Sequence, residues 1–274
     1  MRTLSVIGLG RVGRSLAKLF YQQQVFHIGS VLARQLVSSE AACDFIGSGK
    51  AAKTLREAQQ TDVWMLSVPD DEIEHQAQTL LKEAELSEST IVFHCSGAKP
   101  STILDCLKQR GVSIASVHPV RSFADASTVV ADFAGTYCGI EGDAKAVAIL
   151  SDAFAKIGAQ VFSLSAEHKR RYHAASVIAS NYLVSLIDVA QRCYESAGIE
   201  PELAKRLAEP LASKTLENCF RLGTRAALTG PIKRGDMDIV ALQLQDLQSW
   251  DVQIADLYAA MIPLTQIVAR REER

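Results

Sequence analysis

Two histidines follow β-rich runs at places where a catalytic acid or base could act. His94 comes directly after residues 89–93 and opens the segment HCSGA, in which Ser96 is the nearest hydroxyl. His118 comes directly after residues 112–117 and opens the segment HPVRSF. A histidine titrates near neutral pH, so it can donate or accept a proton as a carbonyl is reduced or an alcohol oxidised. The alternative is that either histidine is a turn residue that hydrogen-bonds only to backbone.

The N-terminal residues predict a dinucleotide site. A short apolar run, residues 4–7, enters the segment GLGRVG, and a pattern typical of an amphipathic helix follows at once. In such a turn the first glycine allows the tight turn and the second lets a pyrophosphate approach the backbone. The third allows close packing of helix on sheet. The expected cofactor contacts here are Gly8, Leu9, Gly10, Arg11, Val12 and Gly13.

The charges of this region favour NADP over NAD. An acidic residue about 20 positions beyond the glycines would bind the ribose hydroxyls of NAD, but no Asp or Glu occurs before Glu40. Arg34 follows the second expected strand, residues 26–32, and with Arg11 it could bind the additional phosphate of NADP. The alternative is a solvated basic face around the end of a strand.

A third group of polar residues lies on one stripe of a predicted long helix, residues 166–197. Lys169, His173, Ser176 and Ser180 follow each other at helical spacing, and Asn181 lies beside them. The other faces of this helix are apolar, which favours burial and a stripe that faces a cleft; the alternative is a stripe that faces solvent. A cleft-facing stripe would bring Lys169 or His173 towards a nicotinamide.

The pattern along the chain predicts an α/β Rossmann fold, doubly wound around a mainly parallel sheet, followed by an all-α domain. Short β-rich runs alternate with helical stretches over residues 1–165, the NADP-binding domain. Helical signals dominate residues 166–274, which we expect to form the substrate and dimerisation domain. Ligands of open α/β sheets lie at the carboxyl ends of the strands, so Ser67, Val68 and Pro69 should border the cofactor.

Composition narrows the class of protein further. The chain has 274 residues, 48% of them hydrophobic, and a formal net charge of −2, which gives no sign of a nucleic-acid or membrane partner. The first strand begins near Thr3, so we expect no signal segment, and we expect no apolar run of membrane-spanning length. The six cysteines lack any CxxC spacing. They predict reduced thiols of a cytoplasmic protein and no metal site.

Taken together, the motifs resemble a known group of proteins. GLGRVG, SVPDDEI, HCSGA, SVHPVRSF, HKRRYHAASVIASNYL and TGPIKRGD look like the Rossmann-like proteins often labelled NADP oxidoreductases of the deazaflavin-dependent type. The resemblance implies a two-domain architecture similar to β-hydroxyacid dehydrogenases, pyrroline-5-carboxylate reductases, ketopantoate reductases and prephenate dehydrogenases. It also implies a homodimer built through the helical second domain.

The sequence departs from these relatives at one informative place. β-Hydroxyacid dehydrogenases and ketopantoate reductases are similar in using a lysine four residues before an asparagine, whereas Val177 stands four residues before Asn181. Lys169 or His173 would have to take that role. The segments HCSGA and SVHPV look more like those of prephenate dehydrogenases, which favours Ser96 and His118 as contacts to substrate.

The sequence therefore predicts an NADP-dependent oxidoreductase that transfers a hydride between nicotinamide and a small carbonyl, imine or hydroxy-acid-like substrate. His118 or His173 would donate and accept the proton, and Ser96, Asn181 and Lys169 would orient the substrate oxygen. Lys233 and Arg234 could bind a substrate carboxylate or form a solvated loop. The alternative is an NADP-binding sensor or regulatory protein without turnover, which the missing lysine–asparagine pair favours.

Overall fold

The computed structural model describes residues 1–58 and 60–271, and they divide into two compact units. Unit 1 comprises Met1–Ser180 and unit 2 comprises Asn181–Arg274, of which 181–271 are described. The division lies within the helical stretch that the sequence assigns to the second domain. The first helical turns of that stretch therefore belong to the same unit as the sheet.

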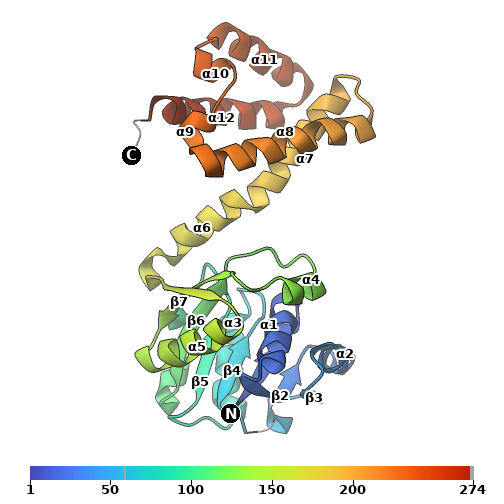
Figure 1. Cartoon of the computed structure of the whole chain (residues 1–274). Coiled ribbons are helices and arrows are strands. Elements are labelled where there is room, and N and C mark those ends of the chain that lie inside the picture. The colour runs from blue at the N-terminus through green and yellow to red at the C-terminus, as the bar shows by residue number, and fades with distance from the viewer. Residues whose placement is uncertain (59, 272–274) are drawn as a thin grey trace. The chain divides into compact units, whose positions relative to one another are not determined.

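Unit 1 is built on an eight-stranded sheet in the order β3-β2-β1-β4-β5-β6-β7-β8 (Figure 1). The strands are β1 Arg2–Ile7, β2 Phe26–Leu32, β3 Lys50–Ala52, β4 Val63–Leu66, β5 Ile91–His94, β6 Ser113–Pro119, β7 Tyr137–Gly142 and β8 Gln160–Ser163. Every pairing is parallel except that of β6 with β7. The strand order reverses between β1 and β4, which is where Rossmann folds bind their ligands.

Helices cover both faces of the sheet, as the alternating pattern predicts. One face carries α1 Arg11–Gln22, α2 Leu36–Ile46, α4 Ala126–Ala131 and α5 Ala144–Lys156. The other carries α3 Ile73–Glu83 and the 3-10 helix η2 Ser101–Arg110. Short 3-10 turns form at η1 Leu55–Glu57 and η3 Ala166–His168, and α6 Lys169–Ala179 completes the unit. The α/β Rossmann architecture predicted from the sequence is confirmed.

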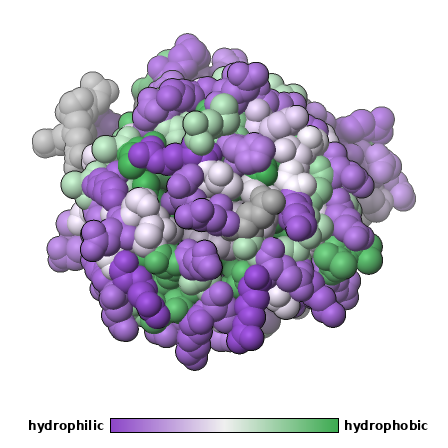
Figure 2. Space-filling view, turned by 90° about the horizontal axis from the view of Figure 1, so that it is seen from below, coloured by the Kyte–Doolittle hydropathy of each residue, from purple (hydrophilic) through white to green (hydrophobic). Residues whose placement is uncertain are grey.

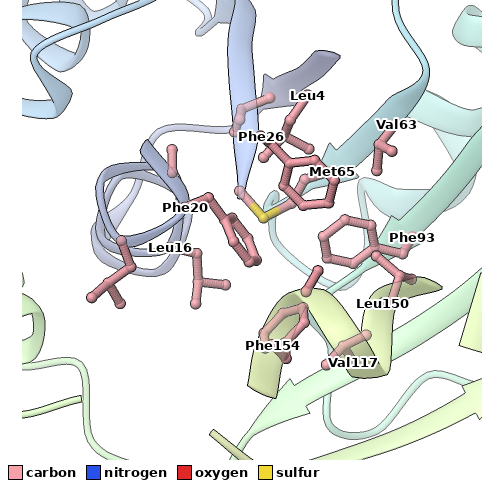
Figure 3. Close-up of a cluster of buried hydrophobic side chains, with 14 of the residues drawn as sticks. Leu4, Leu16, Phe20, Phe26, Val63, Met65, Phe93, Val117, Leu150 and Phe154 are labelled. Atoms are coloured by element: carbon pink, nitrogen blue, oxygen red, sulfur yellow. The ribbon is translucent and has the colours of Figure 1, made fainter. Parts of the chain in front are cut away.

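Aromatic packing holds α1 and α5 against the sheet (Figure 3). Phe20 of α1 lies edge-on to Phe26 and to Phe154 of α5, with ring centroids 5.1 and 5.2 Å apart. Phe154 in turn lies edge-on to Phe93 of β5 at 6.1 Å. Such pairs add to the gain from burying the rings. This cluster holds the last turn of α1 against the sheet and against α5.

Unit 2 contains helices and, in the residues described, no strand. They are α7 Asn181–Ser196, α8 Pro201–Leu222, α9 Thr224–Ala227, α10 Pro231–Arg234, α11 Met237–Trp250 and α12 Val252–Arg270. The expected single helix over 166–197 is wrong. Ser180 leaves helical geometry, with φ −121° and ψ −68°, and separates α6 from α7.

The apolar side chains of unit 2 are mostly exposed. Among its described residues, only five are buried: Ala204, Ala208, Val240, Ile254 and Ala255. Exposed large apolar residues occur on α7, α8, α11 and α12, and include Val184, Leu211, Phe220, Leu242 and Leu264. By contrast, the face seen in Figure 2 is mostly hydrophilic, with separate small apolar patches.

Two helical stretches reach the length and apolar character of a membrane span, contrary to the expectation from the sequence. They are Ala166–Ser196 and Val252–Arg270. Their apolar residues are interspersed with polar ones, so that neither forms an uninterrupted apolar run. Length and composition alone do not place a helix in a membrane, because helices that pack against protein pass the same test.

Candidate active site

The glycine turn between β1 and α1 has the local geometry that a dinucleotide turn requires. Gly8 adopts φ +91°, and a Cβ atom added there would collide with the carbonyl group of Ser67. A Cβ atom on Gly13 would collide with the carbonyl oxygen of Gly8 and lie 3.0 Å from the Ser67 Cβ. These two glycines therefore let α1 pack closely against the ends of β1 and β4.

Gly10 differs from its neighbours because the space beside it is open. A Cβ atom on Gly10 would meet no atom within 4 Å, and the residue has φ −64°, which any amino acid can adopt. Gly10 caps α1 without a side-chain hydrogen bond, and the first turn of α1 contains no acidic residue. The first amide groups of α1 therefore remain available to an anion that approaches the bare side of Gly10.

Four basic residues near this turn divide into two pairs. Arg14 stacks over Phe45 at 5.5 Å, and Lys18 donates to the carbonyl oxygen of Phe45 at 2.6 Å. Both packed side chains therefore attach α1 to α2. Arg11 and Arg34 are exposed, and in the part of the chain that the structure describes neither forms an ion pair. Arg34 lies just beyond the end of β2.

His94 is fully buried and satisfied by its own turn. Its Nδ1 atom accepts from the amide of Ser96 at 3.1 Å, and its Nε2 atom lies 3.3 Å from the carbonyl oxygen of Pro100. Burial and the nearby charge of Lys169 lower the pKa of His94 to about 3. The ring therefore stays neutral and holds residues 94–100, which matches the expected alternative of a turn residue.

Ser96 turns its side chain into the same loop. Its hydroxyl oxygen accepts from the amides of Ala98 and Lys99 at 3.1 and 2.9 Å. This arrangement is a serine turn, in which the hydroxyl replaces a backbone acceptor. The structure thus gives Ser96 a role in shaping the loop that follows β5.

Lys169 lies at the start of α6 and is completely buried rather than open to a cleft. Its Nζ atom donates to the Ser96 carbonyl oxygen at 2.8 Å and to the Ser116 hydroxyl, and lies 3.7 Å from Glu141 Oε1. Glu141 also accepts from the amide and hydroxyl of Ser101, at 2.7 and 2.6 Å. The ammonium group therefore joins β5, β6, β7 and α6.

Burial sets the protonation of this ammonium group. Desolvation lowers the pKa of Lys169 to about 8, and the neighbouring carboxylate of Glu141 opposes that shift. Because the pair is buried together, its two charges largely cancel. A buried pair of this kind fixes geometry more than it adds net stability.

His118 and His173 converge on Gly97, the residue that follows Ser96. A Cβ atom on Gly97 would collide with Nδ1 of His173 and lie 2.8 Å from Nε2 of His118. The two imidazole rings are nearly perpendicular, with centroids 5.5 Å apart. Nδ1 of His173 is buried and has no hydrogen-bond partner among the described residues. Two ring nitrogens therefore pack against Gly97, where they take the room that a side chain would need.

The environment keeps His118 neutral. Burial, together with the charges of the neighbouring His173 and Lys169, lowers the pKa of His118 to about 4. On its other side, Nδ1 of His118 lies 2.8 Å from the phenol oxygen of Tyr172. A neutral imidazole can donate from one nitrogen and accept at the other, which suits it to bind a substrate oxygen.

The polar stripe predicted on the long helix is divided between the two units. Lys169 and His173 lie on α6 in unit 1, whereas Asn181 begins α7 in unit 2. In unit 2, Arg234 of α10 pairs with Asp236 at 2.8 Å. Ser67, Val68 and Pro69 directly follow β4, where the sequence places them.

Sequence reasoning missed three residues of this arrangement. Tyr172 lies outside the polar stripe of the predicted helix, although its position directly before His173 was a usable signal. Glu141 and Ser116 meet because they are paired across β6 and β7. No local sequence pattern predicts such a pairing.

No group of three or more His, Cys, Asp or Glu side chains in the described ranges could hold a metal ion. The six cysteines are all free thiols. Burial raises the pKa of Cys95 and of Cys138 to about 12. These two thiols are therefore poor nucleophiles at neutral pH.

Two family models together match most of the chain. A Rossmann-like domain matches residues 2–119, and a domain of unknown function, DUF2520, matches residues 136–264. The two matches agree with the two-part architecture that the sequence motifs imply, a Rossmann-like region followed by a second region. His118 lies in the first matched segment, and Lys169 and His173 lie in the second. The candidate site joins the two.

Solved structures of similar fold cover the whole chain. Protein TM1727 from Thermotoga maritima is 29% identical, with 99% of this chain and 100% of that chain covered and a TM-score of 0.76. A proposed NADP oxidoreductase, BF3122 from Bacteroides fragilis, is 20% identical, covers 97% and 98%, and has a TM-score of 0.78. A pyrroline-5-carboxylate reductase from Coxiella burnetii is 14% identical, covers 98% and 99%, and has a TM-score of 0.61. No curated protein sequence matches the chain.

The buried histidines make the unfolding free energy depend on pH. Between the ordinary pKa of 6.5 and the folded value of about 3, the unfolded chain binds a proton at His94 that the folded chain excludes. Unfolding free energy should therefore fall as the pH falls below 6.5, by up to about 1.4 kcal/mol per pH unit for this residue. His94→Asn keeps an acceptor for Ser96 and should flatten the slope. Urea denaturation followed by circular dichroism between pH 8 and 4.5 measures both slopes.

The difference in unfolding free energy between His94→Asn and the natural chain should stay constant above pH 7 and become smaller below it. Since His118 adds its own dependence, some slope should remain in the variant. Equal slopes in the two proteins would contradict the burial of an uncharged His94.

Proposed function

We propose that this protein is an NADP-dependent oxidoreductase that acts on a small carbonyl, imine or hydroxy-acid-like substrate. The observation that carries the proposal is the convergence of His118 and His173 on Gly97, in the same unit as the glycine turn. A dinucleotide turn, together with a neutral imidazole on β6 and a second imidazole from α6 beside it, suits hydride transfer that is coupled to proton transfer. The likeness to a proposed NADP oxidoreductase and to a reductase supports it.

The proposed cofactor contacts follow from the geometry of the turn. The bare side of Gly10 and the free amides of α1 would receive the pyrophosphate, with Leu9 and Val12 beside them. Arg11 and Arg34 would bind the additional phosphate of NADP. Ser67, Val68 and Pro69, after β4, would border the nicotinamide half. When bound, the nicotinamide supplies or accepts the hydride.

Proton transfer and the positioning of the substrate would depend on side chains of the protein itself. His118 or His173 would move the proton to or from the substrate oxygen or nitrogen. Lys169 would act through the backbone, because it binds the Ser96 carbonyl and so fixes the loop that contains Gly97. Ser96 would shape the same loop, and Asn181 remains a proposed contact to substrate. Deazaflavin belongs among the candidate substrates.

A second candidate function is an NADP-binding sensor or regulatory protein without turnover. It is favoured by Val177, which stands where β-hydroxyacid dehydrogenases have the lysine four residues before the asparagine. Such a protein would bind NADPH and oxidise it with no member of a substrate panel. The fold itself supports both functions equally.

We further propose a cytoplasmic homodimer formed through unit 2. With five small or aliphatic buried residues, unit 2 has too little core of its own, while Phe220 of α8 is 89% exposed. A second copy offers the same apolar helices and would cover them symmetrically. The free cysteines agree with a reducing compartment.

The cofactor proposal predicts opposite effects for two glycines. Gly10→Ala should leave folding unchanged, because its Cβ meets nothing, but should weaken NADPH binding at least tenfold by blocking the approach of the pyrophosphate. Gly13→Ala should destabilise the fold, because its Cβ collides with the Gly8 carbonyl. Thermal unfolding and titration of NADPH fluorescence measure the two properties. Unchanged NADPH affinity in the folded Gly10→Ala variant would refute the assignment.

Arg34→Ala separates the two dinucleotides within the same experiment. It should weaken NADPH binding and leave NADH binding unchanged, because only NADP carries the extra phosphate. Equal losses for both would show that Arg34 serves another purpose.

An assay of NADPH oxidation distinguishes the proposed enzyme from the proposed sensor without turnover. The purified protein should oxidise NADPH with at least one member of a panel of keto acids, imines and deazaflavin. His118→Ala and His173→Ala should each lower that rate at least a hundredfold while NADPH affinity stays the same. Binding of NADPH without turnover across the panel would favour the sensor, and absence of NADPH binding would exclude both.

The dimer predicts the behaviour of an exposed aromatic residue. The natural chain should have the mass of two copies by light scattering, and Phe220→Asp should shift it to one copy, because a carboxylate is costly in an apolar interface. Val37→Asp, at a residue of α2 that is 73% exposed, is the matched control and should stay dimeric. A monomeric natural chain, including one that sediments with phospholipid vesicles, would contradict the proposal.

A further inference from the structure

The side chain of Tyr172 is held by contacts with His118 and Phe162. The hydroxyl lies 2.8 Å from His118 Nδ1, and the two rings pack edge to face with centroids 5.5 Å apart. Phe162 of β8 packs edge-on against the other side of the Tyr172 ring, with centroids 6.1 Å apart. These contacts leave the ring little freedom beside His118.

A glycine in the neighbouring strand makes room for this hydroxyl. Gly139 of β7 is the residue paired with His118 of β6. A Cβ atom on Gly139 would lie 3.1 Å from the phenol oxygen, closer than side chains normally approach. A residue with a side chain opposite His118 would therefore push the phenol away from the imidazole.

The direction of this hydrogen bond depends on the tautomer of His118, and a protonated phenol is able to donate. Burial raises the pKa of Tyr172 to about 12, so its hydroxyl keeps a proton at neutral pH. Among the described residues, His118 Nδ1 is its only hydrogen-bond partner. A phenol that donates to Nδ1 requires a neutral imidazole to carry its own proton on Nε2, because the two nitrogens of neutral histidine differ in role.

We propose that Tyr172 is the positioning residue that fixes His118 with its proton on Nε2, so that a hydrogen-bond donor faces the space beside Gly97. His173 Nδ1, which has no partner, faces the same space and supplies the acceptor. The inference rests on the proposed function in assigning this space to the reacting group of the substrate. It deepens that function by giving the two histidines different tasks.

The donor on His118 and the acceptor on His173, both beside Gly97, determine which kind of chemical group could bind between them. A hydroxyl would match this pair chemically, because its oxygen can accept from His118 and its proton can be donated to His173. In oxidation, the hydroxyl proton would pass to His173 Nδ1 as the alcohol becomes a carbonyl, and a bound nicotinamide would supply the hydride acceptor. In reduction, His173 returns the proton to the oxygen while the hydride moves back. His118 stays neutral and stabilises the oxygen throughout.

The tautomer of His118 can be measured without any substrate. In protein labelled with nitrogen-15 in histidine, long-range nitrogen–proton correlation spectra should show His118 with its proton on Nε2, and the missing signals of His118→Gln assign it. Tyr172→Phe keeps the ring packing and removes only the hydroxyl. It should shift the tautomer towards Nδ1 protonation and raise the pKa of His118. Tyr182→Phe, at an exposed tyrosine of α7, should change neither.

Turnover supplies a second readout. Tyr172→Phe should lower kcat at least tenfold and leave the KM for NADPH unchanged, because the phenol touches His118 and not the glycine turn. A proton on Nδ1 of His118 in the natural chain, or an unchanged tautomer in Tyr172→Phe, would overturn the inference. Since the spectra need no substrate, a protein that lacks turnover but shows the Nε2 tautomer would refute the proposed function and retain the role of Tyr172.

Discussion

The burial of one ammonium group is the constraint on which the candidate site depends. Lys169 donates from α6 to the loop after β5 and to β6, and Glu141 of β7 supplies the opposite charge. If either partner were removed, the other charge would remain in a place that water does not reach, at a cost of about 3–5 kcal/mol. The pair therefore holds α6 in the one position that places Tyr172 and His173 beside His118 and Gly97.

The glycine turn could be predicted because each of its requirements is local. A positive φ at Gly8, a close approach at Gly13 and an open side at Gly10 all follow from a strand, a turn and a helix that are adjacent in sequence. The same holds for the alternation of strands and helices, which predicts a doubly wound sheet. Where these short-range rules apply, the sequence is sufficient to place the residues.

The contacts of α6 could not be predicted, because they depend on an exception within the sheet. β7 runs antiparallel to β6, which sets Glu141 opposite Ser116 and Gly139 opposite His118. A helical wheel identifies Lys169 and His173 as one face but does not reveal what that face meets. In the structure one member of the stripe is sealed inside the protein and another packs against Gly97. The break at Ser180 then separates both from Asn181.

Electrostatics divides unit 1 into two regions of different character. The turn between β1 and α1 contains the amide groups of a helix start and two exposed arginines, Arg11 and Arg34, and the first turn of α1 has no acidic residue. The strand ends of β5 and β6 are close to neutral, because His118 is uncharged and Lys169 is balanced by Glu141. An anion is therefore attracted to the first region, whereas in the second region burial and the charge of Lys169 keep His118 neutral. Under the proposed function, this separation would let one sheet bind a highly charged cofactor and still exchange a proton with a small substrate.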